Sequence, residues 1–410
     1  MIMAVKDIFD GNSWDQWAED IRYRWDNAMW YYKTNYSKEI GFYVWLQYLF
    51  FTQWQKLKKY ANDKGLKIIG DIPIYVAYDS ADVWAHPEMF QLDQERKPAA
   101  VAGCPPDGFS ADGQLWGNPL YRWDHHRNTG YDWWVTRISW CFRLYDVVRI
   151  DHFRGFDEPM FVPVVCDYYC GGFDEYFPIP AKDKTAVNGH WEKGPGIELF
   201  QVIKARLGEK PIIAEDLGYV TDTVRRMVKE SGYPNMKVLE FAFDSRDSSG
   251  AGDYLPHNYE HNCVAYTGTH DNETILGWLS SIKPEEIQMV RAYLNRPTES
   301  KQVLASELVR TTIASVADTC IIPIQDYLGL DNSARINFPS TLGTNWRWRL
   351  IKSDLTKALA DSIRKQNIVY GRVMWEDLQE DEKPKDPEEE KETETEPKQK
   401  KDSSVKEAKD

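Results

Sequence analysis

Apolar and polar positions along the chain form a repeating unit, a helix or loop followed by a short apolar strand. Residues 37–64 show the helical part most clearly, because large apolar side chains recur there at three- and four-residue steps. Ser37 is expected to cap this helix and Gly65 to end it. The following stretch, "LKIIGDIPIYVA", predicts a strand that runs into Asp71. The apolar stripe of the helix consists of Phe42, Trp45, Leu46, Leu49, Phe50, Trp54 and Leu57.

Five further strands follow, and each ends in a carboxylate. Helices are expected at about 131–145, 196–207, 221–231 and 299–317. The strands and their terminal acids are "DVVRID" with Asp151, "PIIAED" with Glu215 and Asp216, "MKVLEFAFD" with Asp244, "CVAYTGTHD" with His270 and Asp271, and "CIIPIQD" with Asp326.

This alternation of helices with wholly apolar strands indicates a parallel sheet covered on both faces. Right-handed crossovers then place all the carboxyl ends, and therefore all these acids, on one side of the sheet. An open nucleotide-binding sheet would also put its site there, but neither G-x-G-x-x-G nor G-x-x-x-x-G-K-[ST] occurs. We therefore predict the α/β class and a (β/α)8 TIM-type barrel, with its site on the carboxyl-end rim. About six of the eight strands are apparent, so the barrel is expected to be incomplete in this chain.

Two segments lie outside the repeat. Residues 79–130 show little regular structure and contain "VAGCPPDGFSADGQLWGNPLYRW"; long loops in compact domains are usually functional, so residues 100–120 are the candidate lid. From residue 376 to residue 410 there are 15 Asp and Glu against 8 Lys, a net charge of −7, with almost no apolar residues. We expect a catalytic barrel domain over 1–375 and a disordered acidic tail over 376–410.

Composition narrows the function classes further. The net charge of −14 offers no basic face for nucleic acid, and no apolar run reaches the roughly 18 residues of a membrane span. The N-terminus lacks the features of a signal peptide, and the six Cys have no framework spacing, so a cytoplasmic protein without metal or cofactor is expected. The 17 Trp and 23 Tyr fit either sugar-binding walls or a large core.

Three of the acids have neighbours that suit catalysis. Arg149 lies two residues before Asp151, on the same side of the strand, and can hold its carboxylate ionised, as a nucleophile requires. Glu215 ends an apolar strand, which should raise its pKa and suit a general acid. Asp271 follows His270 in "TGTHDN", a stretch of groups that can bond sugar hydroxyls.

This set of acids has other interpretations. Carboxylates on a barrel rim also bind Mg²⁺ and can act with a Lys or His base. Some of them could simply cap the following helices, which is the expectation for Asp244 and Asp326.

Five motifs in order resemble the amylomaltase family of 4-alpha-glucanotransferases, also called disproportionating enzymes, which are similar to α-amylases. They are "IIGDIPIYVA", "GQLWGNPLYRW", "VVRIDHFRGF", "PIIAEDLG" and "YTGTHDNET", and the likeness continues through "RINFPSTLGTNWRWRL" to about residue 350. The resemblance implies an α-1,4-glucan donor and a glucose or malto-oligosaccharide acceptor.

The same resemblance implies roles for individual residues. Asp151 would be the nucleophile that carries a covalent glucosyl intermediate, Glu215 the general acid/base and Asp271 the transition-state stabiliser. The residues expected to bind the substrate are Arg149, His270, Asp71, Trp116, Asn118, Asn272 and His152.

The chain departs from the family pattern in two places. The family has a further stretch before the first motif, including the first barrel strands, so the resemblance predicts that the N-terminal part is missing. After "RGFDE", an apolar insertion is expected at about 159–174, and "GFDE" occurs on both sides of it. The alternatives left open are therefore a truncated glucan-binding fragment without catalysis and a retaining α-glucan hydrolase.

Overall fold

The structure of the chain is a computed structural model that describes most of the first 373 residues. The described ranges are 1–104, 114–157, 177–180 (backbone only), 192–218, 220–245, 251–339, 341 and 343–373. The predicted insertion at 159–174, the tail at 376–410 and part of the candidate lid lie outside these residues.

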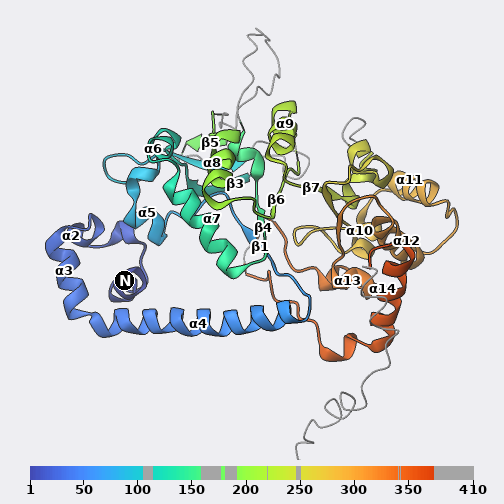
Figure 1. Cartoon of the computed structure of the whole chain (residues 1–410), viewed down its shortest axis with the longest axis horizontal. Coiled ribbons are helices and arrows are strands. Elements are labelled where there is room, and N and C mark those ends of the chain that lie inside the picture. Colours follow the sequence, from blue (N-terminus) through green and yellow to red (C-terminus); the bar gives the residue numbers. More distant parts are fainter. Residues whose placement is uncertain are drawn as a thin grey trace, which may run out of the picture.

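Six short parallel strands form the centre of the molecule (Figure 1). They comprise one sheet with the order β1 (Ile69–Ile72), β4 (Val147–Ile150) and β6 (Ile212–Ala214), and a second with the order β7 (Asn235–Val238), β8 (Cys263–Tyr266) and β9 (Thr319–Ile321). The two sheets meet where the amide of Ala214 donates to the carbonyl of Pro234 at 3.0 Å. The strand order is therefore β1-β4-β6-β7-β8-β9, and all six predicted strands are present.

Several strands are shorter than the sequence indicates. "MKVLEFAFD" leaves the sheet after Val238 and continues as the 3-10 helix η4 (Leu239–Phe243), and "CIIPIQD" continues as α13 (Ile324–Tyr327). Within the described ranges, β1 and β9 are each hydrogen-bonded to one strand.

The five predicted helices are also present, with ends that differ from the predicted ones by at most four residues. They are α4 (Ser37–Asp63), α7 (Asp132–Leu144), α8 (Ile197–Leu207), α9 (Asp222–Ser231) and α12 (Lys301–Ile313). The remaining helices are α1 (Ile2–Ile8), α2 (Glu19–Arg22), α3 (Asp26–Asn35), α5 (Ala81–Ala85), α6 (Trp123–Asn128), α10 (Ile275–Ser281), α11 (Pro284–Leu294) and α14 (Lys357–Val369).

Two local predictions were wrong. Segment 79–130 contains α5, α6 and the antiparallel strands β2 (Ala100–Cys104) and β3 (Gln114–Pro119), with β5 (Phe177–Pro180) on the other side of β2. These elements are short and depend on distant pairing, which leaves no periodic signal in the sequence. Ser37 does not cap α4, because Tyr36 occupies the N-cap position and makes no side-chain cap bond.

The core has one large apolar cluster on each half of the strand array and a smaller cluster, formed by side chains of β6, β7 and β8, between them. Around β1, β4 and β6, the largest buried side chains are aromatic and include Trp14, Trp134 and Phe153. Around β9, the buried faces of α10 and α12 pack with aliphatic residues such as Leu304 and Leu308. Much of the aromatic content therefore fills the first cluster.

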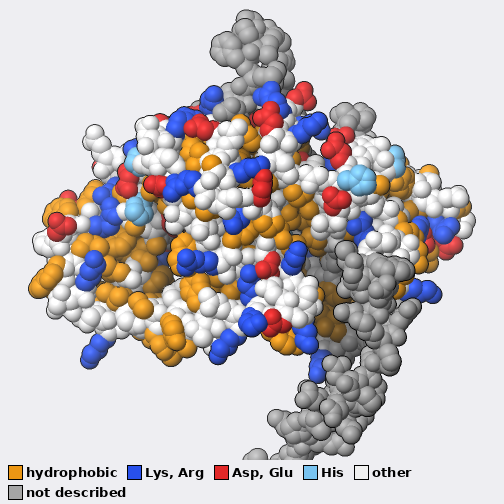
Figure 2. All heavy atoms as spheres, viewed as in Figure 1, with side chains coloured by type: hydrophobic (Ala, Val, Ile, Leu, Met, Phe, Trp, Pro, Cys, Tyr) orange, Lys and Arg blue, Asp and Glu red, His pale blue; other side chains and the backbone are white. Residues whose placement is uncertain are grey.

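The long helix α4 differs from the other predicted helices because it buries none of its residues. Phe42, Trp45 and Phe50 from its apolar stripe are 52%, 53% and 49% exposed. Contact with the rest of the fold comes from side chains such as Trp54, whose indole N–H donates to the carbonyl of Leu144 at 2.8 Å. Figure 2 shows hydrophobic side chains along this lower edge of the molecule, and Figure 1 shows the helix running there. Among the described residues, no helix combines the length and apolarity needed to cross a membrane.

Candidate active site

A buried arginine joins three strands at the centre of the candidate site. Arg149 lies on β4, opposite Asp71 on β1, and is 8% exposed. Its guanidinium donates to Asp71 Oδ2 at 2.6 Å and to Asp151 Oδ1 at 3.1 Å. A third contact, from Nε to Met236 Sδ at 3.3 Å, reaches β7. The sequence placed Arg149 and Asp151 on one side of the strand, and the structure adds Asp71 as a second carboxylate on the same cation.

The Glu215 carboxyl lies directly beside this ion pair. It is 8% exposed and follows β6, and both of its oxygens accept backbone hydrogen bonds. The amide of His152 donates to Oε2 at 2.6 Å and that of Leu217 donates to Oε1 at 2.7 Å. Burial and the negative charge of Asp151 raise the pKa of Glu215 to about 7, despite these bonds and the charge of Arg149. At neutral pH this carboxyl can therefore either give or take a proton.

The environment of Asp151 is less simple than the sequence indicated. Its side chain is 43% exposed, so a substrate can reach it. Partial burial raises the pKa of Asp151, and the charges of Asp71 and Asp271 act in the same direction, while Arg149 lowers it. Arg149 alone therefore does not hold the pKa of Asp151 below its usual value. The negative charge of Asp151 is in turn one of the causes that raise the pKa of Glu215.

Asp271 is held by a side-chain amide, by the adjacent histidine and by an arginine bond to its backbone carbonyl. Its carboxylate lies 3.2 Å from His270 Nε2 and accepts from Asn337 Nδ2 at 2.5 Å, and Arg335 donates to its backbone carbonyl at 2.7 Å. Burial alone would raise the pKa of Asp271, but the bonds from His270 and Asn337 outweigh it and leave the pKa below its usual value. The same contact raises the pKa of His270. Sequence reasoning missed Arg335 and Asn337, although both lie in the string "RINFPS" that carries the end of the resemblance.

The other expected substrate-binding residues lie in different settings. Trp116, at the base of the candidate lid, is 36% exposed and meets the His152 ring edge-on at 4.7 Å between ring centroids. His152 has a left-handed backbone, and burial lowers its pKa to about 3. Asn118 donates to the carbonyl of Val76 at 2.9 Å, and Asn272 bonds Thr269 in its own loop and the buried carboxyl of Glu240. Trp116 and His152 therefore lie beside the carboxylates, whereas the two amides hold backbone segments.

Two of the remaining strand-end acids serve the fold. Asp216 accepts from the amide of Met236 at 3.0 Å and so links the segment after β6 to β7. Asp326 accepts from the amide of Ile275, the first residue of α10, at 2.8 Å. This is a bond to a helix N-terminus, as expected for Asp326, but the helix is α10 rather than the one that follows it.

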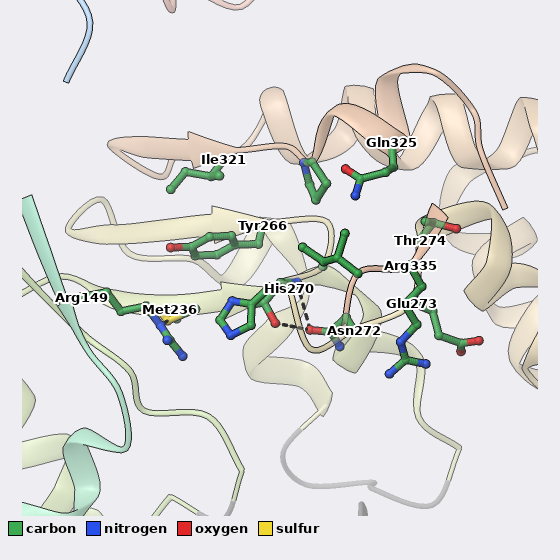
Figure 3. A pocket seen from close by; sticks show the side chains of 14 residues that line it. Arg149, Met236, Tyr266, His270, Asn272, Glu273, Thr274, Ile321, Gln325 and Arg335 are labelled. Atoms are coloured by element: carbon green, nitrogen blue, oxygen red, sulfur yellow. Dashed lines mark hydrogen bonds between the residues drawn. The ribbon is translucent and has the colours of Figure 1, made fainter. Parts of the chain in front are cut away.

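A cavity of about 290 Å³ adjoins these groups on the side of β7, β8 and β9. Figure 3 shows Arg149 and Met236 at one end of it, His270 and Asn272 along one wall, and Arg335 and Gln325 at the other end. The catalytic candidates Asp151, Glu215 and Asp271 do not line it. The cavity therefore borders the carboxylate cluster without enclosing it.

Known proteins match this chain over most of its length. The sequence profile of the 4-alpha-glucanotransferase family covers residues 1–354. The 4-alpha-glucanotransferase of Clostridium butyricum is 45% identical over 373 residues, which are 91% of this chain and 72% of that enzyme. The enzyme of the same name from Streptococcus pneumoniae is 44% identical and is matched over 90% of this chain and 70% of its own length.

A solved structure supports the same relationship. The structure of amylomaltase from Streptococcus agalactiae in complex with acarbose superposes with a TM-score of 0.82 at 41% identity, covering 90% of this chain and 71% of that one. Sequence profile, sequence relatives and fold agree, and the chain belongs to the 4-alpha-glucanotransferase family.

Proposed function

We propose that this 4-alpha-glucanotransferase moves an α-1,4-glucan segment from a donor glucan to an acceptor sugar in two displacements. Asp151 is the nucleophile, Glu215 the general acid and base, and Asp271 the stabiliser of the transition state. The donor is an α-1,4-glucan and the acceptor is glucose or a malto-oligosaccharide.

In the first displacement, Asp151 Oδ attacks the anomeric carbon while the bond to the leaving glycosidic oxygen breaks. Glu215 gives its proton to that oxygen, so the reducing-end portion leaves as a neutral sugar and the remainder is esterified to Asp151. The half-exposed Asp151 is accessible for this attack. Glu215 has a pKa of about 7 and is therefore largely protonated below neutral pH.

In the second displacement, an acceptor hydroxyl attacks the same anomeric carbon and the ester to Asp151 breaks. Glu215, now ionised, takes the hydroxyl proton and returns to its starting state. Two inversions at one carbon retain the α configuration of the glucan. A pKa near neutrality serves both steps, because the group donates in one and accepts in the other.

The remaining polar groups act on the sugar at the cleavage point. Asp271 is held below its usual pKa, so it remains an anion that can stabilise positive charge developing on the sugar ring. In this proposal His270 and Asp71 bond sugar hydroxyls. Arg149 orients the Asp151 carboxylate, and the exposed Trp116 ring offers an apolar surface beside His152. Asn118, Asn272 and His152 complete the proposed substrate-binding set.

Transfer rather than hydrolysis requires that sugar reaches the glucosyl ester before water does. Tight acceptor binding and closure of the candidate lid over residues 100–120 would achieve this. The described ends of that segment are β2 and β3, which pair at the edge of the site.

The observation that carries the proposal is the arrangement of Glu215, fixed by the amides of His152 and Leu217 and adjacent to the Arg149–Asp151 pair. The test is to incubate the purified protein with maltotriose and resolve the products by length. Glucose together with a ladder of longer glucans is the expected result, and Asp151→Asn should remove both. Glucose and maltose without longer products would indicate the retaining hydrolase instead. Starch binding without turnover would indicate a non-catalytic fragment.

A further inference from the structure

Another buried acid, Glu240, packs against the loop that carries Asp271 and has no role in the proposed reaction. It belongs to η4, immediately after β7, and is 6% exposed. One oxygen, Oε2, accepts from Asn272 Nδ2 at 3.1 Å. The other, Oε1, has no hydrogen-bond partner among the described residues. Burial and the negative charges of Asp326 and Glu273 raise the pKa of Glu240 well above its usual range.

A directed chain of hydrogen bonds leads from this acid to Asp271. Asn272 Oδ1 accepts from the Thr269 amide at 3.0 Å and from the Thr269 hydroxyl at 2.7 Å. Since an amide N–H can only donate, the carbonyl side of Asn272 must face Thr269 and its NH₂ must face Glu240. The Thr269 hydroxyl in turn accepts from the backbone amide of Asp271 at 3.3 Å. In this chain each polar group can act only as the donor or the acceptor assigned to it, so Glu240 Oε2 must accept the bond from Asn272.

The packing around Glu240 leaves little freedom. A Cβ at Gly268 would lie 2.9 Å from Glu240 Oε1 and 3.1 Å from Asn272 Cβ, so any larger residue there would displace the acid or the loop. The backbone amide of Glu240 also donates to the carbonyl of Thr267 at 3.3 Å. The loop from Gly268 to Asn272 therefore rests directly on this side chain. Figure 3 shows Asn272 next to His270 at this point, with its bonds to Thr269 drawn as dashed lines.

We propose that Glu240 is a positioning residue that, through Asn272 and Thr269, fixes the loop presenting His270 and Asp271 to the sugar. The inference rests on the proposed role of Asp271 and adds a residue that makes no contact with substrate. If this is so, any side chain at position 240 that accepts a hydrogen bond from the Asn272 NH₂ should keep the loop in place, even without a charge. A side chain without an acceptor would leave the Asn272 NH₂ unpaired and the loop misaligned.

The test compares three variants with the unmodified chain in maltotriose disproportionation. Glu240→Gln keeps an acceptor oxygen for the Asn272 NH₂, so kcat should stay within about threefold of the parent. Glu240→Leu has similar size but no acceptor, so kcat should fall roughly 10- to 100-fold with KM changed less than about twofold. Glu286→Leu is the matched control, because Glu286 is an equally buried acid whose bonds to Ser245 and Lys283 lie away from the loop. It should lower the thermal midpoint without changing kcat of the folded fraction.

A second pair tests the intermediate link without touching the buried acid. Thr269→Ser keeps the hydroxyl and should preserve kcat, whereas Thr269→Val has nearly the same shape without the hydroxyl and should lower it about tenfold. This pair remains informative even if Glu240→Leu folds poorly. A folded Glu240→Leu or Thr269→Val with parental kcat would overturn the proposal, and so would a Glu240→Gln as impaired as Glu240→Leu.

A double-mutant cycle separates this inference from the proposed function. If Asp271→Asn lowers kcat strongly and Glu240→Leu adds little to it, both statements hold, because the positioning acts through Asp271. If the two losses simply multiply, Glu240 does not act through Asp271 and the positioning role fails alone. If Asp271→Asn keeps parental activity, the proposed function of Asp271 fails first.

Discussion

The two halves of the strand array hold their candidate acids in different ways. In the half formed by β1, β4 and β6, the acids surround the buried guanidinium of Arg149. In the half formed by β7, β8 and β9, Asp271 is held by hydrogen bonds from neighbouring side chains. Asp71, Asp151 and Glu215 all feel the charge of Arg149. Asp271 also feels the charge of Arg149, but its position depends on Asn337, on His270 and on the loop that contacts Glu240. We therefore expect changes in the first half to alter the protonation of the catalytic carboxyls. Changes in the second half should alter the orientation of the Asp271 carboxylate.

The largest effect is expected from removing the nucleophile. Asp151→Asn keeps the size of the side chain but cannot form the glycosyl ester, so kcat/KM for maltotriose should fall at least about 10³-fold. Asp271→Asn keeps the covalent route and should be less severe than Asp151→Asn. Steady-state kinetics on both variants measure the difference, and an Asp271→Asn loss that exceeds the Asp151→Asn loss would reverse the assignment of roles between the halves.

The next-largest effect is expected from changing the protonation of the general acid, Glu215. Because burial and the charge of Asp151 raise the pKa of Glu215 to about 7, the acid form needed for the first displacement is lost as pH rises through about 7. The pH profile of donor kcat/KM should therefore fall on its alkaline side near that value. Glu215→Gln should lower kcat/KM about 10²- to 10⁴-fold and flatten the alkaline limb. An unchanged alkaline limb in the Gln variant would assign that limb to another group.

Replacing Arg149, whose guanidinium bonds both Asp71 and Asp151, should lower activity by an intermediate amount. Arg149→Lys retains the charge but not the fork that bonds Asp71 and Asp151 together, so kcat should fall roughly 10- to 100-fold. The loss is expected for any donor that reacts at Asp151, including one with a good leaving group. Parental rates in a folded Arg149→Lys would mean that charge alone, without geometry, suffices in this half.

A smaller effect is expected from one neutral donor in the other half. Asn337→Ala removes the bond to Asp271 Oδ1, so kcat should fall about tenfold while the alkaline limb of the pH profile stays near 7. Asn345→Ala is a suitable control, because Asn345 bonds the nearby backbone of Phe338 and Thr341 and does not contact Asp271. A displaced alkaline limb in Asn337→Ala would show that the two halves share one titration.

The smallest effect is on stability. Since the pKa of Glu215 is raised in the folded protein, the folded state binds its proton more tightly than the unfolded state, and stability falls as pH rises from about 4.5 through 7. Glu215→Gln lacks this titration, although its NH₂ cannot accept the second backbone bond, so its thermal midpoint relative to that of the parent should rise by about 2–4 °C between pH 5 and pH 8. Equal shifts at both pH values would show that Glu215 is not a neutral acid in the folded state.

Much of the strand array was accessible to sequence reasoning, for a physical reason. A buried parallel strand is apolar along its length, so all six strands were predicted correctly, but Asp244 and Asp326 do not lie at strand ends, because Asp244 follows a 3-10 helix and Asp326 lies in α13. The geometry of Arg149 with Asp151 followed from the two-residue period of a strand. The family motifs then supplied the chemistry that the pattern alone left open.

The features of the fold and of the site that the sequence did not predict depend on contacts between distant segments. Arg335 and Asn337 reach Asp271 from more than 60 residues away, and nothing local in "RINFPS" indicates that contact. The apolar stripe on α4 predicted a helix correctly but not its burial, because periodicity reports a face without reporting what covers it. The strands β2 and β3 were missed for a similar reason, as β2 gains a partner in β5 some 75 residues later.

The most direct test of the account is to trap the proposed intermediate on Asp151. The Glu215→Gln variant is mixed with α-maltotriosyl fluoride, whose fluoride leaves without a proton, and the reaction is quenched in acid and digested for mass spectrometry. The account predicts a maltotriosyl adduct on the peptide containing Asp151, absent from the Asp151→Asn, Glu215→Gln double variant. Glycosyl transfer without any adduct, or an adduct on a different residue, would contradict it.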